Sequence, residues 1–189
     1  MADLKPKAAL QAAASRGAEI VPVRVPDIAA INTVARVILL AEASALLEPH
    51  LEQRDLFGAD VLALLDQGRL LPATDYINAQ RLRRAIEREF AGLWPRVDCL
   101  FTPTTPITAP RIGETTVTVG SEPEDVRLAA TRLVRAINAL GLPAVSIPYG
   151  ADRRGLPIGL QIVGQPFAEG LVLRVAQALV PGEVPIPRL

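Results

Sequence analysis

Two amphipathic helical patterns separated by a short apolar run constrain the fold of this chain most strongly. Residues 74 to 94 repeat apolar side chains at helical spacing, and residues 125 to 140 do the same. Between them, Asp98–Thr102 has the length and composition of a short buried strand. Gly141 and Pro143 follow the second pattern and predict where its helix ends. This alternation of helices and short strands predicts the α/β class.

The rest of the chain continues the alternation. Helices are predicted at residues 5–16, 28–47, 58–66 and 169–180, and strands at residues 18–23, 144–148 and 157–164. Gly68 is predicted to stop the helix at 58–66, and Thr74 with Asp75 to cap the helix at 74–94. Residues 113–124 show little periodicity and predict a surface loop. We expect residues 1–189 to form one portion of a single domain.

The helix at 74–94 sorts its side chains into distinct faces. The predicted core stripe contains Ala79, Leu82, Ile86, Phe90 and Leu93, and the opposite, solvated face contains Arg81, Arg84 and Arg88. Arg83 lies beside the apolar stripe, where a guanidinium must be paired or must face a pocket. It forms an i,i+4 ion pair with Glu87, or it donates to a carboxylate or amide carbonyl of a substrate. The residues alone leave both roles open.

Composition excludes several classes of function. Twenty basic and twenty acidic residues cancel, so the chain offers no net positive charge for direct nucleic-acid binding. One cysteine and one histidine exclude an internal disulfide framework and a cysteine- or histidine-rich metal cluster. No uninterrupted apolar run reaches the ~18 residues of a membrane-spanning helix. We therefore expect a cytoplasmic protein without a membrane segment, a metal or a cofactor.

No set of residues forms a self-sufficient catalytic site. His50 is the one imidazole base, and no nucleophile-elbow pattern surrounds any of the four serines. Cys99 lies in an apolar strand, where burial raises the pKa of a thiol and keeps it unreactive. The lysines, Lys5 and Lys7, lie near the N-terminus, which argues against a serine–lysine site. Three scattered carboxylates are interpreted as caps or solvated charges: Asp98, Asp125 and Asp152.

Three long stretches in the second half of the chain carry a family resemblance. They are D-C-L-F-T-P-T-T-P-I-T-A-P (Asp98–Pro110), N-A-L-G-L-P-A-V-S-I-P-Y-G (Asn138–Gly150) and G-L-P-I-G-L-Q-I-V-G (Gly155–Gly164). Upstream, A-E-A-S (Ala41–Ser44) and D-Y-I-N-A-Q-R-L-R (Asp75–Arg83) occur in the same order. Together they resemble the C-terminal part of amidase-signature enzymes. The resemblance implies the C-terminal portion of a mixed-sheet α/β fold with helices packed on both faces.

The resemblance also implies a chemistry for which this chain lacks the residues. Family members hydrolyse or transfer amides with a Ser–Ser–Lys triad and a backbone oxyanion hole, without metal or cofactor. Those residues lie in an earlier, glycine- and serine-rich part of the family's chain, and no two serines are adjacent here. We therefore expect an amidase-signature hydrolase acting on small linear amides, with this chain as its C-terminal, substrate-shaping lobe. Alone, the chain is predicted to be inactive and to associate, through unpaired strand edges, with the missing N-terminal amidase portion or another chain.

The resemblance assigns no catalytic residue to this chain and three residues to substrate binding: Arg83, Thr131 and Asn138. Arg83 matches the arginine that holds the glutamine carboxylate in the A subunits of glutamyl-tRNA(Gln) and aspartyl-tRNA(Asn) amidotransferases. Two further matches fail, because Ala35 and Arg36 stand where a tyrosine is expected and Thr131 stands where an acidic residue is expected. These departures favour a general amidase. A fragment of such an A subunit and a non-catalytic binding lobe are the alternatives.

Overall fold

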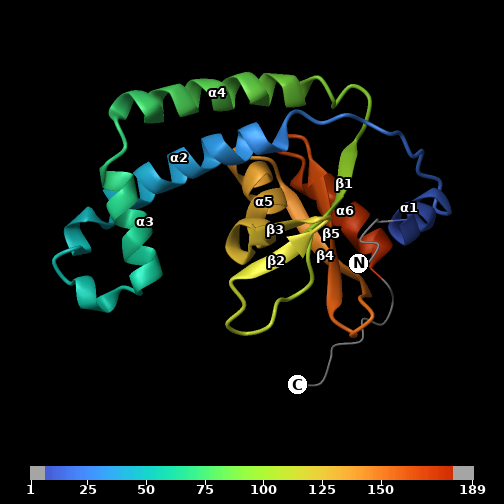
Figure 1. Ribbon diagram of the computed structural model, residues 1–189. Helices are drawn as coiled ribbons and strands as arrows, with labels where there is room; N and C mark the ends of the chain where they lie inside the picture. Colours follow the sequence, from blue (N-terminus) through green and yellow to red (C-terminus); the bar gives the residue numbers. More distant parts are fainter. Residues whose placement is uncertain (1–6, 181–189) are drawn as a thin grey trace. The chain divides into compact units, whose positions relative to one another are not determined.

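The computed structural model describes residues 7–180 and divides into two compact units (Figure 1). Over the described residues, one unit consists of residues 7–25 together with 91–180, and the other of residues 26–90. Each unit contains its own cluster of buried apolar side chains. Helices and strands alternate along the chain, which confirms the predicted α/β class.

The first unit is built on a three-stranded antiparallel sheet. Its strands are ordered β1 (Cys99–Pro103), β5 (Pro157–Gly164) and β4 (Ala144–Ala151). Ile162 of the central strand pairs with Phe101 on one side and with Val145 on the other. All three strands were predicted from the sequence, and the turn between β4 and β5 makes these two strands neighbours in the sheet.

Two helices belong to the core on one face of this sheet. α6 (Glu169–Leu179) contacts β4 and β5, and α1 (Lys7–Ala14) contacts α6 (Figure 1). The core is made of small and branched apolar side chains: Ala9, Ala13, Ile147, Leu160, Ile162, Val172, Ala176 and Leu179. Ile162 is fully buried, and burial of such a side chain stabilises a fold by roughly 1.5–3 kcal/mol. The helices predicted at the two ends of the chain are therefore confirmed over the described residues.

A hairpin lies where the sequence predicted a loop. β2 (Thr116–Val119) pairs with β3 (Glu122–Asp125), so the prediction of a surface loop for residues 113–124 is wrong. Gly120 turns the chain between the strands with a φ of 70°, which glycine adopts without steric strain. Asp125 then caps α5 (Val126–Ala139), since its carboxylate accepts hydrogen bonds from two backbone N–H groups at 2.8 and 3.1 Å.

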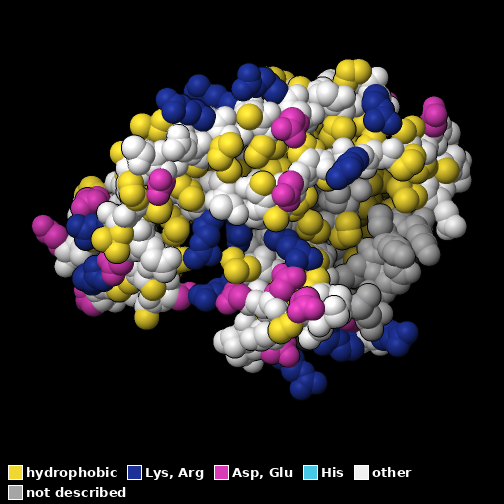
Figure 2. Space-filling model, turned by 45° about the horizontal axis from the view of Figure 1, so that its top comes forward, with side chains coloured by type: hydrophobic (Ala, Val, Ile, Leu, Met, Phe, Trp, Pro, Cys, Tyr) yellow, Lys and Arg dark blue, Asp and Glu magenta, His cyan; other side chains and the backbone are white. Residues whose placement is uncertain are grey.

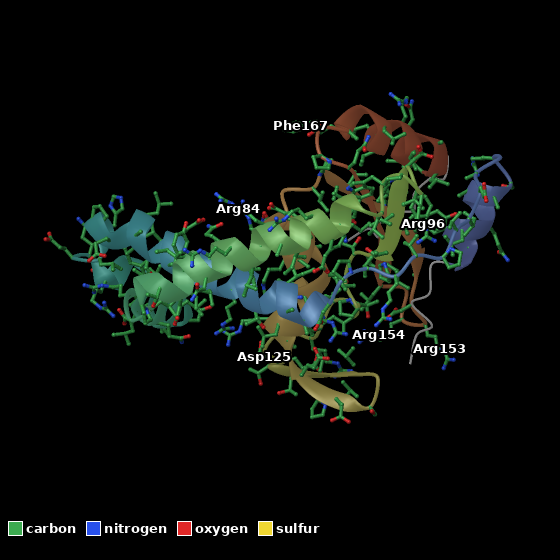
Figure 3. All side chains as sticks on the ribbon, turned by 90° about the horizontal axis from the view of Figure 1, so that it is seen from above. Arg84, Arg96, Asp125, Arg153, Arg154 and Phe167 are labelled. Atoms are coloured by element: carbon green, nitrogen blue, oxygen red, sulfur yellow. The ribbon has the colours of Figure 1, made fainter. Side chains whose placement is uncertain are left out.

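The second unit is helical. Its elements are α2 (Ile28–Leu47), the 3-10 turns η1 (Glu48–His50) and η2 (Arg54–Leu56), α3 (Ala59–Arg69) and α4 (Ala73–Ala91). Asp27 caps α2 by accepting a hydrogen bond from the backbone N–H of Ala29 at 2.8 Å. α2 and α4 lie side by side, and Val34 and Ile38 form one buried cluster with Ala79 (Figures 1 and 3).

A glycine and a serine bring α3 close to α2. The buried Ser44 hydroxyl oxygen lies 2.7 Å from the carbonyl oxygen of Leu40 and 2.8 Å from that of Leu65. A Cβ added at Gly68 would lie 2.1 Å from both the Leu40 carbonyl oxygen and the Ser44 hydroxyl. Gly68 therefore lies inside α3 as the residue of closest approach. The prediction that it stops the helix is wrong, because α3 continues to Arg69.

Two predictions at element boundaries are also wrong. Residues 18–23 form no strand with any described part of the chain, and Pro22 removes an N–H donor that a strand ladder needs. α4 begins at Ala73, so Thr74 and Asp75 lie within its first turn instead of capping it. Side-chain chemistry alone placed this helix start one residue late.

The faces of α4 follow the predicted pattern in most places. Ala79, Phe90 and Leu93 of the core stripe are buried, whereas Leu82, at the edge of the stripe, is exposed. The basic face is exposed at Arg81, Arg84 and Arg88. Figure 2 shows basic side chains grouped over α4, and those of α4 are all arginines. The interpretation of this face as solvated is confirmed.

Among the described residues, one helical stretch, Ile28–His50, is long and apolar enough to cross a membrane by length and composition. Polar residues interrupt it, so no unbroken apolar run of that length exists in it. One third of its most apolar 18-residue segment is buried. Core helices of non-membrane proteins have the same character, and α2 contacts α3 within its own unit.

Candidate functional site

Arg83 lies on α4 and forms the ion pair that its spacing predicted. Its Nε atom is 3.0 Å from Oε1 of Glu87, one helical turn further on, and both side chains are about one-third exposed, at 35% and 33%. The Nε atom is shielded from solvent, and its N–H makes no well-directed hydrogen bond. Glu87 therefore neutralises the charge of Arg83 without meeting the directional requirement of this donor.

A hydrogen-bonded group lies on the same flank of α4 as Arg83. The Tyr76 hydroxyl donates to Oε1 of Glu42 at 2.9 Å, and Nε2 of Gln80 lies 3.0 Å from the Tyr76 oxygen and 3.3 Å from the same Glu42 oxygen. Glu42 belongs to α2, so this group fixes α4 relative to α2 within the second unit. It sets the position of the flank on which Arg83 lies. The sequence named these residues within its motifs and assigned them no contacts.

Thr131 and Asn138 lie on α5, in the first unit. The Thr131 hydroxyl donates to the carbonyl oxygen of Arg127 at 2.6 Å and accepts a hydrogen bond from the Arg135 guanidinium. Asn138 is exposed at the last turn, and its backbone carbonyl accepts from the N–H of Gly141 at 3.0 Å. The hydroxyl of Thr131 is therefore engaged within its own helix, while the side chain of Asn138 faces solvent.

An ion pair from the middle of α5 links this helix to the hairpin. Nη1 of Arg132 lies 2.6 Å from Oε1 of Glu124 on β3, and both side chains are partly buried. Charge-assisted contacts of this length are stronger than neutral hydrogen bonds. The pair therefore links α5 to β3 through Arg132.

Four polar side chains form a row on one face of the sheet that the sequence did not identify. Nε2 of Gln161 donates to the Thr102 hydroxyl at 3.0 Å, and the hydroxyl oxygens of Thr104 and Ser146 lie 2.6 Å apart. A Cβ added at Gly159 would lie 2.6 Å from the Thr104 hydroxyl and 2.9 Å from that of Ser146. A threonine hydroxyl cannot remove the proton of a serine at neutral pH, so this row can bind by hydrogen bonds and has no activated nucleophile.

The turn between β4 and β5 is organised by Asp152. Its carboxylate accepts hydrogen bonds from the backbone N–H groups of Arg154 and Leu156 and from the hydroxyl of Thr108. Burial raises the pKa of this carboxyl, but the hydrogen bonds from Leu156, Thr108 and Arg154 outweigh it and lower the pKa to about 2. Arg154, labelled in Figure 3, belongs to this turn. Of the two roles predicted for Asp152, a cap or a solvated charge, the structure shows the cap, because the carboxylate accepts from backbone N–H groups and is largely buried.

Cys99 and His50 are the remaining side chains that the sequence analysis considered as a nucleophile or a base. Burial, followed by the charge of Asp98, raises the pKa of the Cys99 thiol, as the sequence predicted. His50 is exposed in η1. The described residues contain no group of three or more histidine, cysteine, aspartate or glutamate side chains placed to hold a metal ion.

Comparison with known proteins connects these elements to one family. The sequence model of the amidase family matches residues 5–173. A fatty acid amide hydrolase of Medicago truncatula is 38% identical over 167 residues, which are 87% of this chain and 28% of that protein. An amidase of Pseudomonas putida is 38% identical over 174 residues, which are 91% of this chain and 37% of that protein.

Two further comparisons cover an alternative relative and a solved structure. A glutamyl-tRNA(Gln) amidotransferase A subunit of Leptospira interrogans is 42% identical over 104 residues, which are 55% of this chain and 20% of that protein. The crystal structure of an amidase superposes with a TM-score of 0.85 at 29% identity, over 92% of this chain and 40% of that chain. The chain thus spans less than half the length of each of these relatives.

Proposed function

The chain belongs to the amidase family, and we propose that it is the substrate-shaping portion of a hydrolase that cleaves the C–N bond of small linear amides. The observation that carries this proposal is the family match across residues 5–173. The proposed setting is the cytoplasm, with no cofactor and no direct contact with nucleic acid.

The proposed division of labour leaves the catalytic triad outside this chain. The amidase-signature resemblance implies two nearby serines and a lysine base, whereas the four serines here are separated in sequence and Ser146 pairs with a threonine hydroxyl. Lys5 precedes the described residues, and Lys7 is the first of them. We therefore expect the isolated chain to hydrolyse no amide and the active form to include a polypeptide portion that carries the triad.

The proposed contribution of this chain is to binding, through Arg83, Thr131 and Asn138. The Arg83 guanidinium offers donors to a carboxylate or an amide carbonyl, and the poorly directed contact with Glu87 leaves its Nε–H available to a better-placed acceptor. The exposed amide of Asn138 supplies both a donor and an acceptor. Thr131 contributes through its methyl group, or through its hydroxyl when that group donates to the substrate instead of to the carbonyl oxygen of Arg127.

Fluorophosphonate labelling combined with an amide hydrolysis assay tests this proposal. Fluorophosphonates react with activated serines, so the purified 20.2 kDa chain should remain unlabelled and inactive toward a panel of fluorogenic linear acyl amides. The assembly isolated from the protein's own cells should hydrolyse members of the panel and carry the label on a serine outside these 189 residues. A label on Ser146 or another serine of this chain would contradict the division of labour.

The second candidate function is glutamine hydrolysis as part of an amidotransferase A subunit. Arg83 and the 42% identity to the Leptospira subunit favour it, whereas Thr131 and the pair Ala35 and Arg36 depart from its expected residues. The same assembly distinguishes the two candidates: release of ammonia from glutamine without cleavage of acyl amides supports the A-subunit assignment. Saturable binding of a second polypeptide by an assembly that is inactive on both substrates supports a non-catalytic binding lobe.

A further inference from the structure

Phe167, in the connection from β5 to α6, combines two unfavourable features. It is the one non-glycine residue with a positive φ among the described residues, at 64°, and its side chain is 95% exposed. Figure 3 shows it where the chain enters α6. A positive φ is sterically unfavourable for a large side chain, and full exposure of an aromatic ring forgoes its hydrophobic stabilisation.

Glycine or asparagine at position 167 would avoid both features, because either residue adopts this region of φ with less strain. Backbone strain of this kind costs on the order of 1–3 kcal/mol. No described residue covers the ring and offsets that cost. The aromatic side chain therefore has no stabilising contact within the described chain.

The surrounding connection holds Phe167 in a defined position. Only four residues separate the end of β5 at Gly164 from the start of α6 at Glu169. A Cβ added at Gly164 would lie 2.6 Å from Cγ2 of Val172, so β5 and α6 approach each other as closely as a glycine permits. The backbone N–H of Ala168 also donates to the carbonyl oxygen of Gln165 at 3.1 Å, which closes the turn around Phe167. The ring is thus presented to solvent from a rigid turn.

A rigidly presented aromatic ring is typical of an interface anchor, since such residues contribute most of the binding energy in many protein interfaces. We infer that Phe167 inserts into an apolar pocket of the polypeptide portion that completes the amidase fold around this chain. This inference rests on the proposed function. The choice of partner follows from length: the amidase structure that superposes on 92% of this chain has more than half of its residues outside the match.

Photo-crosslinking from position 167 tests the contact in the protein as it exists. Phe167→p-benzoylphenylalanine, expressed in the protein's own cells, should crosslink on illumination to a peptide from the portion with adjacent serines and an upstream lysine. Leu173→p-benzoylphenylalanine is the matched control, because Leu173 is an exposed apolar residue on α6 without a positive φ. It should give much less of the same product. A crosslink to a second copy of this chain, or no crosslink at 167, would overturn the inference.

A second variant separates the contact from folding. Phe167→Gly relieves the backbone strain, so the urea midpoint of the isolated chain should stay the same or rise, while the recovered partner portion should fall about tenfold or more. Leu173→Ala should change recovery by less than about twofold. Undiminished recovery with Phe167→Gly would overturn the anchor role and leave the proposed function intact. If the unmodified chain is neither continuous with an amidase portion nor bound to one, the proposed function itself fails.

Discussion

Gly68→Ala should destabilise the second unit even though alanine is the better helix former. On an exposed helix, replacement of glycine by alanine stabilises by ~1 kcal/mol. At position 68 the added Cβ would lie 2.1 Å from the backbone carbonyl oxygen of Leu40, which cannot rotate away. Overpacking costs ~1–3 kcal/mol, and displacement of the buried Ser44 hydroxyl from its carbonyl partners costs ~1–3 kcal/mol more. The net expectation is a loss of roughly 1–5 kcal/mol, because these penalties exceed the gain in helix propensity.

Amide hydrogen exchange followed by mass spectrometry measures this loss where it occurs. Peptides from α2 and α3 should exchange faster in Gly68→Ala, while peptides from α6 keep their protection. Gly170→Ala is the matched control, since a Cβ there meets only the Nη1 atom of Arg174, at 3.6 Å. That variant should be as stable as the unmodified chain or up to about 1 kcal/mol more stable. Unchanged or slower exchange of α2 and α3 in Gly68→Ala would refute the close-approach argument.

Four further predictions follow from individual contacts. Asp27→Ala should lower the free energy of unfolding by ~1 kcal/mol in urea titrations, whereas Asp27→Asn should retain most of the cap; equal losses would contradict capping. Asp152 has a folded-state pKa of about 2, below its unfolded value of about 3.9, so its stabilisation is present above about pH 4 and is lost as the pH falls toward 2. Asp152→Asn should remove this part of the acid dependence of the urea midpoint, and an unaltered pH profile would show that the carboxylate contributes nothing. The Cys99 thiol, whose pKa is raised by burial, should react with iodoacetamide at neutral pH more slowly in the folded chain than in urea. In the active assembly, Arg83→Ala should raise KM for amides with an anionic group by about tenfold at unchanged kcat, and Arg84→Ala should alter neither; identical kinetics in both variants would leave Arg83 with its Glu87 pair alone.

Local signals in the sequence predicted most of the helices and strands. The 28–47 helix was predicted to the residue because the segment is rich in apolar residues and Pro49 follows it closely. The hairpin at 116–125 was missed, although T-V-T-V alternates and Gly120 follows it, because Pro123 and three acidic residues obscure the second strand. Gly68 was misinterpreted because its role comes from the approach of α2, which no local pattern encodes.

The candidate site likewise contains some contacts that local sequence spacing predicts and others that depend on the tertiary fold. The Arg83–Glu87 ion pair was foreseen as one of two roles because helical spacing alone brings those side chains together. The Thr104–Ser146 pair joins residues 42 positions apart and depends on the registers of both β1 and β4 against β5, so it needed the structure. Phe167 was likewise missed, since nothing about a phenylalanine in sequence indicates a positive φ.

The most direct test of the account is the intact mass of this protein isolated from its own cells, together with the identity of any polypeptide that remains bound to it. The account predicts either a polypeptide heavier than 20.2 kDa or a tight partner, in each case with adjacent serines and an upstream lysine outside these 189 residues. A solitary 20.2 kDa chain without a bound polypeptide would contradict the proposed division between a triad-bearing portion and this substrate-shaping portion.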